Sequence, residues 1–152
     1  MGVAVDRMVA LLRDNTTPVF LDVFVGEPIG LPPDGPYASL RYLGDSDPPE
    51  GMRTMGNYMR EERFQVRVYW HKRPERATHI DWEKDIVAGK QALRAAFAGD
   101  VFLNNSGSSR VVDALDIGDA QCGYVRMSDG MEYRVLEFEL RLRDLNAEEE
   151  TG

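Results

Sequence analysis

Hydrophobic and polar positions alternate in the middle of the chain and then change to a period of three or four. The alternating stretch covers residues 61–70. Its apolar positions are Phe64, Val66, Val68 and Trp70, with Arg63, Gln65 and Arg67 between them. Because successive side chains of a strand point to opposite faces, this stretch predicts a strand with one buried and one solvated face. Residues 80–97 then follow the spacing of an amphipathic helix, which Gly99 would end.

The remaining pattern predicts one more helix and several strands. The first dozen residues show helical spacing of apolar side chains, and residues 19–25 are almost wholly apolar, which favours a strand buried on most of both faces. Further strands are expected over 37–43, 110–115, 120–127 and 131–143. Within the last of these, Tyr133 and Val135 fall out of step with the later apolar positions, which predicts a bulge or a sheet crossing near Val135.

This order of elements predicts an α+β fold: an antiparallel or mixed sheet with two helices packed on one face. The 152 residues are the size of one ordinary domain, which we assign to 1–143. Residues 144–152 are acidic and poor in apolar side chains, so we expect a flexible C-terminal tail.

Residues 44–60 join two strands that are expected to pair, although a hairpin needs only two to five residues there. Such a long connection without periodicity is usually functional or disordered. Its candidate contact residues are Met52, Arg53, Met55, Tyr58, Met59 and Arg60. Methionine suits adaptable interfaces, and Tyr and Arg are enriched in them. Two interpretations stay open: a partner-binding arm, or a loop whose methionines pack on the domain's own core.

The polar side of the predicted sheet carries charged rows. Its candidate interface residues are Arg63, Arg67, Glu137 and Arg141. One interpretation is a solvated face with cross-strand Arg–Glu pairs. The other is a face or edge that pairs with a neighbouring subunit.

Composition narrows the classes of function. The chain has 18 Lys and Arg against 26 Asp and Glu, a net charge of −8, which argues against a surface that grips phosphate backbones. A net charge of this size is equally well explained by the need to keep the protein soluble. No run approaches the roughly 20 apolar residues of a membrane span, and the first residues lack the pattern of a signal peptide. With one cysteine and no disulfide framework, we expect a protein made in the reducing interior of a cell.

Residues that could carry chemistry are sparse. His71 and His79 lie eight positions apart without the tight ligand pairs of a zinc site. Cys122 lies in a predicted strand, where we expect a buried small hydrophobic side chain. We find no phosphate loop, nucleophile elbow or zinc-protease pattern. We therefore expect no catalytic site, metal or cofactor, and no enzymatic activity.

The order of elements over about residues 3–142 resembles that of the small tail terminator (tail completion) proteins of long-tailed bacteriophages. The correspondence comprises the first helix ending in Leu11 and Leu12, the stretch 19–25, the strand start at Pro36 and Tyr37, the strand end at Tyr69 and Trp70, the alanine-rich end of the helix 80–97, and the closing alternating strand.

The resemblance implies a ring-forming subunit. Six copies would close into a homohexamer at the head-proximal end of the tail tube in the virion, after synthesis in the host cytoplasm. The ring would cap the tail-tube protein, end its polymerisation, and present a surface to the head-completion (connector) protein. DNA would pass through the lumen without specific binding, and no membrane would be involved.

Two other functions stay open. A neck or head-completion protein shares the small size, the acidity and the ring assembly. A small enzyme or ligand-binding domain of the α+β class requires a pocket with convergent polar groups.

Overall fold

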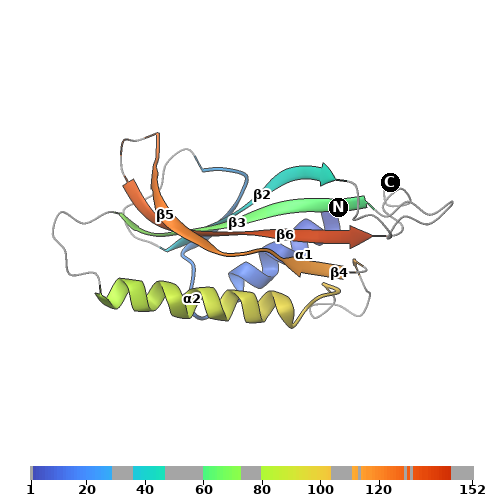
Figure 1. Ribbon diagram of the computed structural model, residues 1–152, viewed down its shortest axis with the longest axis horizontal. Helices are drawn as coiled ribbons and strands as arrows, with labels where there is room; N and C mark the ends of the chain where they lie inside the picture. Colours follow the sequence, from blue (N-terminus) through green and yellow to red (C-terminus); the bar gives the residue numbers. More distant parts are fainter. Residues whose placement is uncertain are drawn as a thin grey trace.

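The computed structural model describes residues 2–28, 36–46, 60–72, 80–103, 111–112, 114–128, 130 and 132–144. The elements are α1 (Gly2–Arg13), β1 (Asp22–Val25), β2 (Tyr37–Ser46), β3 (Arg60–Lys72), α2 (Ile80–Ala98), β4 (Ala114–Ile117), β5 (Gln121–Arg126) and β6 (Glu132–Asp144). Both helices lie on one side of a six-stranded sheet (Figure 1). The predicted α+β class is therefore confirmed.

The sheet is mixed, with the strand order β1-β2-β3-β6-β4. β1 is parallel to β2, and the other pairs are antiparallel. β3 and β6 form the centre, paired from the contact of Arg60 with Asp144 to that of Lys72 with Tyr133. This is the pairing that the two most regular alternating segments of the sequence favour.

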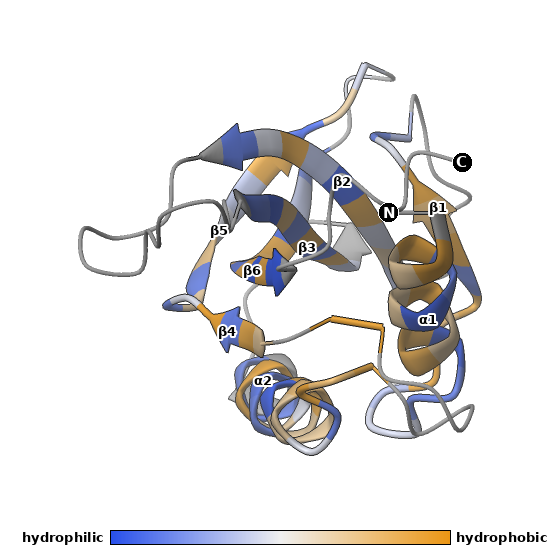
Figure 2. Ribbon diagram, turned by 90° about the vertical axis from the view of Figure 1, so that its right-hand side faces the viewer, coloured by the Kyte–Doolittle hydropathy of each residue, from blue (hydrophilic) through white to orange (hydrophobic). Residues whose placement is uncertain are grey.

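The main core lies between the helices and the inner face of the sheet. Its strand side chains include Phe64, Val66, Val68 and Trp70 from β3 and Leu136, Phe138, Leu140 and Leu142 from β6, all buried. The helices contribute Met8, Leu12, Ile86, Leu93 and Phe97. The hydropathy of β2 and β3 changes from residue to residue along each strand (Figure 2). The predicted alternation of β3 and the helical stripe of α2 are thus confirmed.

A second apolar cluster occupies one end of the outer face, where the sequence predicted solvated side chains. It consists of Tyr37, Tyr69, Met127, Tyr133 and Val135. Tyr133 and Val135 therefore belong to the outer face by ordinary alternation, without a change of register in β6. The predicted irregularity does occur at Val135, but the extra residue is in β3, where the pairing shifts between Tyr69 and His71.

The expectation that 19–25 is buried on most of both faces is wrong. The strand is confined to β1, and Val19, Leu21 and Val25 are 61 %, 58 % and 66 % exposed. β1 is the outermost strand on its side of the sheet, so within the described part of the chain it has a neighbouring strand on one side alone. The apolar run 19–25 thus reflects the preference of these residues for β-strands, and it does not predict that their side chains are buried.

Several boundaries also differ from the prediction. β2 continues to Ser46 and β3 begins at Arg60, so the predicted long loop narrows to 47–59, which lies outside the described residues. β6 includes Asp144, and the rest of the predicted tail is likewise outside them. The strand expected over 110–115 is found at Ala114–Ile117.

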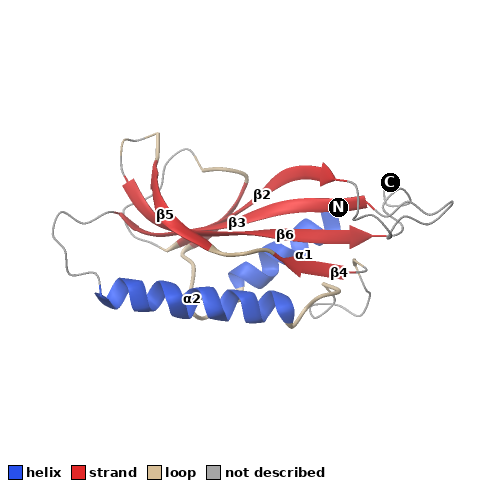
Figure 3. Cartoon of the chain, viewed as in Figure 1, coloured by secondary structure: helices blue, strands red, loops and turns tan. Residues whose placement is uncertain are grey.

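β4 and β5 both pair with β6 along the same edge, one after the other (Figure 3). Between them the amide of Gly118 donates to the carbonyl of Glu139 at 2.7 Å. Arg94 of α2 donates to the carbonyl of Gly118 at 2.5 Å, and this bond ties the helix to the break between the two strands. The sheet consequently ends in β1 on one side and in the β4–β5 pair of segments on the other.

A close contact between α2 and β3 fixes the distance between helix and sheet. Gly89 of α2 faces the buried Trp70, and a Cβ added at Gly89 would overlap the indole ring. The same Cβ would approach Cδ of Pro18 to 3.2 Å. Glycine at this position therefore lets the helix lie against the tryptophan.

We expect Gly89→Ala to lower the free energy of unfolding by about 1 to 2 kcal/mol, because the cost of overpacking the Trp70 contact exceeds the gain of about 1 kcal/mol in helix propensity. Urea unfolding followed by tryptophan fluorescence measures this change. Gly123→Ala serves as the control, since nothing lies within 4 Å of a Cβ at Gly123. Equal stability of the Gly89→Ala protein and the wild type would contradict the packing argument.

Candidate functional site

The strands β2, β3 and β6 direct charged side chains to the outer face of the sheet. The register places Arg67 directly opposite Glu137, and Gln65 opposite both Arg41 and Glu139. Directly opposed residues of an antiparallel pair lie within side-chain contact distance. The alternation that builds the main core on one face therefore assembles ionic groups on the other.

The first part of this network centres on Arg67. Its Nε donates to Oε2 of Glu137 at 3.0 Å, and its Nη1 donates to Oε1 of Glu27 at 3.3 Å. Glu27 also lies 3.6 Å from Nη1 of Arg41, which in turn donates through Nη2 to Oε1 of Gln65 at 2.9 Å. Arg67 thus joins the segment after β1 to β6 across the intervening strands.

The second part runs along β3 and β6 to β4. Nε of Arg63 donates to Oε1 of Glu139 at 2.5 Å, and Arg141 approaches the same oxygen at 3.3 Å. The buried carboxylate of Glu61 lies 3.2 Å from Nε of Arg143 and 3.7 Å from Nε of Arg141. Arg143 also contacts Asp116 of β4 at 2.6 Å. We refer to these pairs, together with those of Arg67 and Glu27, as the outer-face network.

The network changes the titration of its members. The hydrogen bond from Arg63, followed by the nearby positive charges of Arg63 and Arg141, holds the pKa of Glu139 below its ordinary value, although partial burial opposes this effect. The same hydrogen bond raises the pKa of Arg63. Both groups are therefore ionised at neutral pH, as a charge-assisted pair requires.

The structure brings together the four sheet residues that the sequence singled out. Arg63, Arg67, Glu137 and Arg141 share the outer face, and the predicted cross-strand Arg–Glu pairing is confirmed. The side chain of Arg67 is only 14 % exposed, whereas that of Arg141 is 50 % exposed. Of these two, Arg141 is the one that a neighbouring molecule can reach without breaking the network.

The loop candidates remain predictions. Met52, Arg53, Met55, Tyr58 and Met59 lie outside the described residues, and Arg60 is described in its backbone at the start of β3 but not in its side chain.

The outer-face network also contains residues that the sequence interpretation missed. Glu61 and Arg143 continue the same alternation as Arg63 and Arg141, so the period of the strands was a usable signal for them. Glu27 and Asp116 lie on other segments, and their place in the network depends on how those segments pack. Nothing in the local pattern indicates that place.

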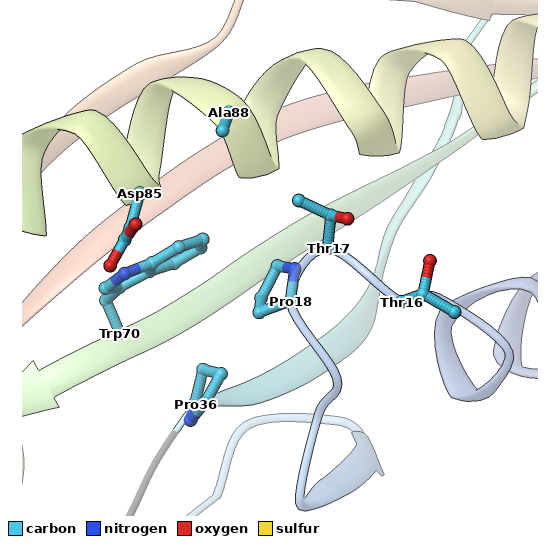
Figure 4. A pocket seen from close by; sticks show the side chains of 7 residues that line it. All are labelled: Thr16, Thr17, Pro18, Pro36, Trp70, Asp85 and Ala88. Carbon is cyan, nitrogen blue, oxygen red and sulfur yellow. The ribbon is translucent and has the colours of Figure 1, made fainter.

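A groove of about 320 Å³ lies between the segment after α1 and helix α2 (Figure 4). It is lined by Thr16, Thr17, Pro18, Pro36, Trp70, Asp85 and Ala88. The indole of Trp70 and the ring of Pro18 form its apolar walls, while Asp85 and the threonine hydroxyls are its polar groups. A single carboxylate can orient a ligand, but general acid–base catalysis usually employs a pair of titrating groups.

Cys122 is exposed, which corrects the expectation of a buried side chain. It lies in β5, at the edge of the sheet, where four of the six strand residues are exposed. Within the described parts of the chain, no three His, Cys, Asp or Glu side chains gather in a way that could hold a metal ion. His79 lies outside those parts, as does the side chain of His71. None of the described helices has the length and apolarity to cross a membrane.

The depressed pKa of Glu139 predicts a specific loss of stability in acid. Its carboxylate stabilises the folded state above the unfolded-state pKa, and this contribution disappears as the pH falls through the lower folded-state pKa. We expect the wild type to be more stable than Glu139→Gln at neutral pH, and the difference to shrink as the pH falls below the ordinary value of 4.5. Urea unfolding at a series of pH values measures it.

Asp6→Asn provides the control, because Asp6 lies on the exposed side of α1, away from the outer-face network. A difference between wild type and Glu139→Gln that stays constant from pH 7 to the acid limit of folding would show that the ion pair does not contribute in the expected way.

No protein-family model matches the chain, and no curated protein matches it.

Proposed function

We propose that this chain is a structural subunit of a phage virion that caps the head-proximal end of the tail tube. It would end polymerisation of the tube and provide the surface for head–tail joining. The proposal starts from the resemblance in element order and is supported by the α+β fold, in which the resembling segments form the two helices and the central strands. The observation that carries it furthest is the pair of unlike sheet edges.

A closed ring of identical subunits needs two different, complementary patches on each subunit. β1 and the β4–β5 segments end the sheet on opposite sides, and they differ in length, direction and side chains. Contacts through two unlike edges lead from one subunit to the next. Self-complementary contact through one patch would instead stop at a dimer.

The ion-paired outer face suits a subunit that must keep its shape under mechanical load. Ion pairs join β3 to β6 and β6 to β4, and Glu27 links Arg41 of β2 to Arg67 of β3. Such a face supplies a rigid surface against which the tail-tube protein or the head-completion protein can dock. In the proposed homohexamer, DNA passes through the lumen, and the net charge of −8 per subunit disfavours its adhesion.

We expect light scattering of the purified protein, mixed with the tail-tube protein of its phage, to reveal a complex that contains about six copies of this chain, as the ring model requires. The protein alone provides the reference mass, and the head-completion protein provides the second binding test.

Binding to the head-completion protein without any binding to the tube would identify a neck protein instead. A monomer that ignores both partners would contradict a role in the virion. Ligand binding in the groove between Pro18, Trp70 and α2 would then be the next function to test.

A further inference from the structure

The β1 edge of the sheet carries apolar side chains in the open. Val25 is exposed on the strand, and Val19 and Leu21 are exposed just before it. Among the described residues no strand pairs with the outer side of β1. Exposed hydrophobic edges of this kind are sites at which another strand adds to a sheet.

At the same edge, one hydrogen bond between a side chain and the backbone blocks the pairing of another strand. The amide of Val23 donates to the carboxylate of Asp22 at 2.8 Å. Every second amide of an edge strand points away from the sheet, and a carboxylate placed on such an amide occupies the position of an incoming carbonyl. Asp22 must therefore move away before a strand can pair along the whole of β1.

The β5 edge lies on the opposite side of the sheet, and it also exposes a large side chain. Tyr124 is 46 % exposed and has the guanidinium of Arg134 5.2 Å from the centre of its ring. Arg126, at the end of the strand, has a side chain that is 70 % exposed and whose Nη2 lies 3.1 Å from Oε1 of Glu132 in β6. The β1 edge thus exposes Val25, and the β5 edge exposes the ring of Tyr124.

The directions of the two edges determine how copies can join. β1 runs with β2, β3 runs against β2, β6 against β3, and β5 against β6, so β1 and β5 run in opposite directions. If a second copy continues the same sheet, its β1 lies antiparallel to the β5 of the first. This arrangement brings the Asp22 end of one strand to the Arg126 end of the other.

The faces of the two strands restrict the register. Phe24 and Val125 both pack against the outer-face apolar cluster, so Val25 and Tyr124 both belong to the inner side. Directly opposed residues of a pair share a face. The antiparallel register that pairs Phe24 with Val125 and Val25 with Tyr124 therefore opposes apolar side chains on both faces.

We propose that β1 of one copy of this chain pairs antiparallel with β5 of the next, with Val25 against Tyr124 and Phe24 against Val125, after the Asp22 carboxylate has left the Val23 amide. The contact is head-to-tail and continues the sheet from subunit to subunit. It deepens the proposed function, on which it rests, because it names the subunit contact of the ring.

Cross-linking between Val25→Cys and the native Cys122 tests the contact directly. In the proposed register Cys122 lies diagonally across from position 25 on the same face, about 7 to 8 Å away, within reach of a short bismaleimide. Each subunit then has one thiol on each edge, so cross-linking yields a ladder of trimers and larger species up to the ring.

Wild-type protein has a single thiol per chain, so it cannot form cross-linked products beyond the dimer. Ala95→Cys is the matched control, because Ala95 is exposed on the side of α2 opposite the buried Leu93 and Phe97. We expect no ladder from it. Efficient dimerisation of the wild type through Cys122 would indicate pairing of two β5 edges and would overturn the proposal.

A charge on the β1 edge gives a second test that needs no cross-linker. We expect Val25→Asp to weaken self-association measured by light scattering by at least about tenfold, because an unpaired carboxylate would be buried against Tyr124. Ala95→Asp should leave self-association unchanged, and circular dichroism shows whether each variant is folded.

The outcomes separate this contact from the proposed function. If the protein forms the expected complex on the tail tube but Val25→Cys gives no ladder there, the edge contact is wrong and the function stands. If the ladder forms but the tube protein is not bound, the contact stands and the function is wrong. A folded protein that gives neither the ladder nor the complex with the tube protein would overturn both the edge contact and the proposed function.

Discussion

The pairing of β3 with β6 is the interaction on which the rest of the structure depends. These two long strands lie side by side along their whole length, and each contributes apolar side chains to one face and charged side chains to the other. The helices pack on the apolar face, and β2, β4 and β5 add to the free sides of the pair. Any change in the register of this pair would rearrange both faces at once.

The outer-face network protects that register. A shift of one residue in a strand exchanges its two faces, which would bury Arg67 or Glu137 in the main core. Single ion pairs on a protein surface contribute little, about 0 to 1 kcal/mol each. Here, however, several are partly buried, and the carboxylates of Glu61, Glu139 and Glu27 each serve two arginines. Their main effect is to raise the free energy of any wrong strand register, because a shift of one strand breaks several ion pairs at once.

The sequence predicted the elements whose pattern is local. The alternation in β3 and β6 and the stripe of α2 follow from periodicity, and the structure has them where expected. Burial at the sheet edges was not predictable in this way. Val25 and Cys122 have side chains that are usually buried, but they lie on outermost strands, a position set by the packing of the whole sheet. The apolar cluster around Tyr69 and Tyr133 was missed for the same reason.

In the candidate site, too, the residues set by local alternation could be predicted, and those set by distant chain segments could not. The charged rows of β3 and β6 could be predicted because alternation fixes the face of each side chain. The contributions of Glu27 and Asp116 depend on chain segments that arrive from elsewhere in the sequence. The close approach of Gly89 to Trp70 is equally non-local, since the sequence shows a glycine in a helix but not the ring that requires it.

The outer-face network joins five arginines to five carboxylates, so these ten side chains together carry no net charge. The acidity of the chain must therefore arise elsewhere on it. An array of alternating charges has a potential that decays within a few ångströms, well inside the Debye length of about 8 Å at physiological salt. To a distant polyanion this group of side chains is almost invisible, and to a molecule in contact it presents a detailed pattern of donors and acceptors. Salt that weakens the long-range repulsion between whole subunits should leave recognition by this pattern nearly unaltered.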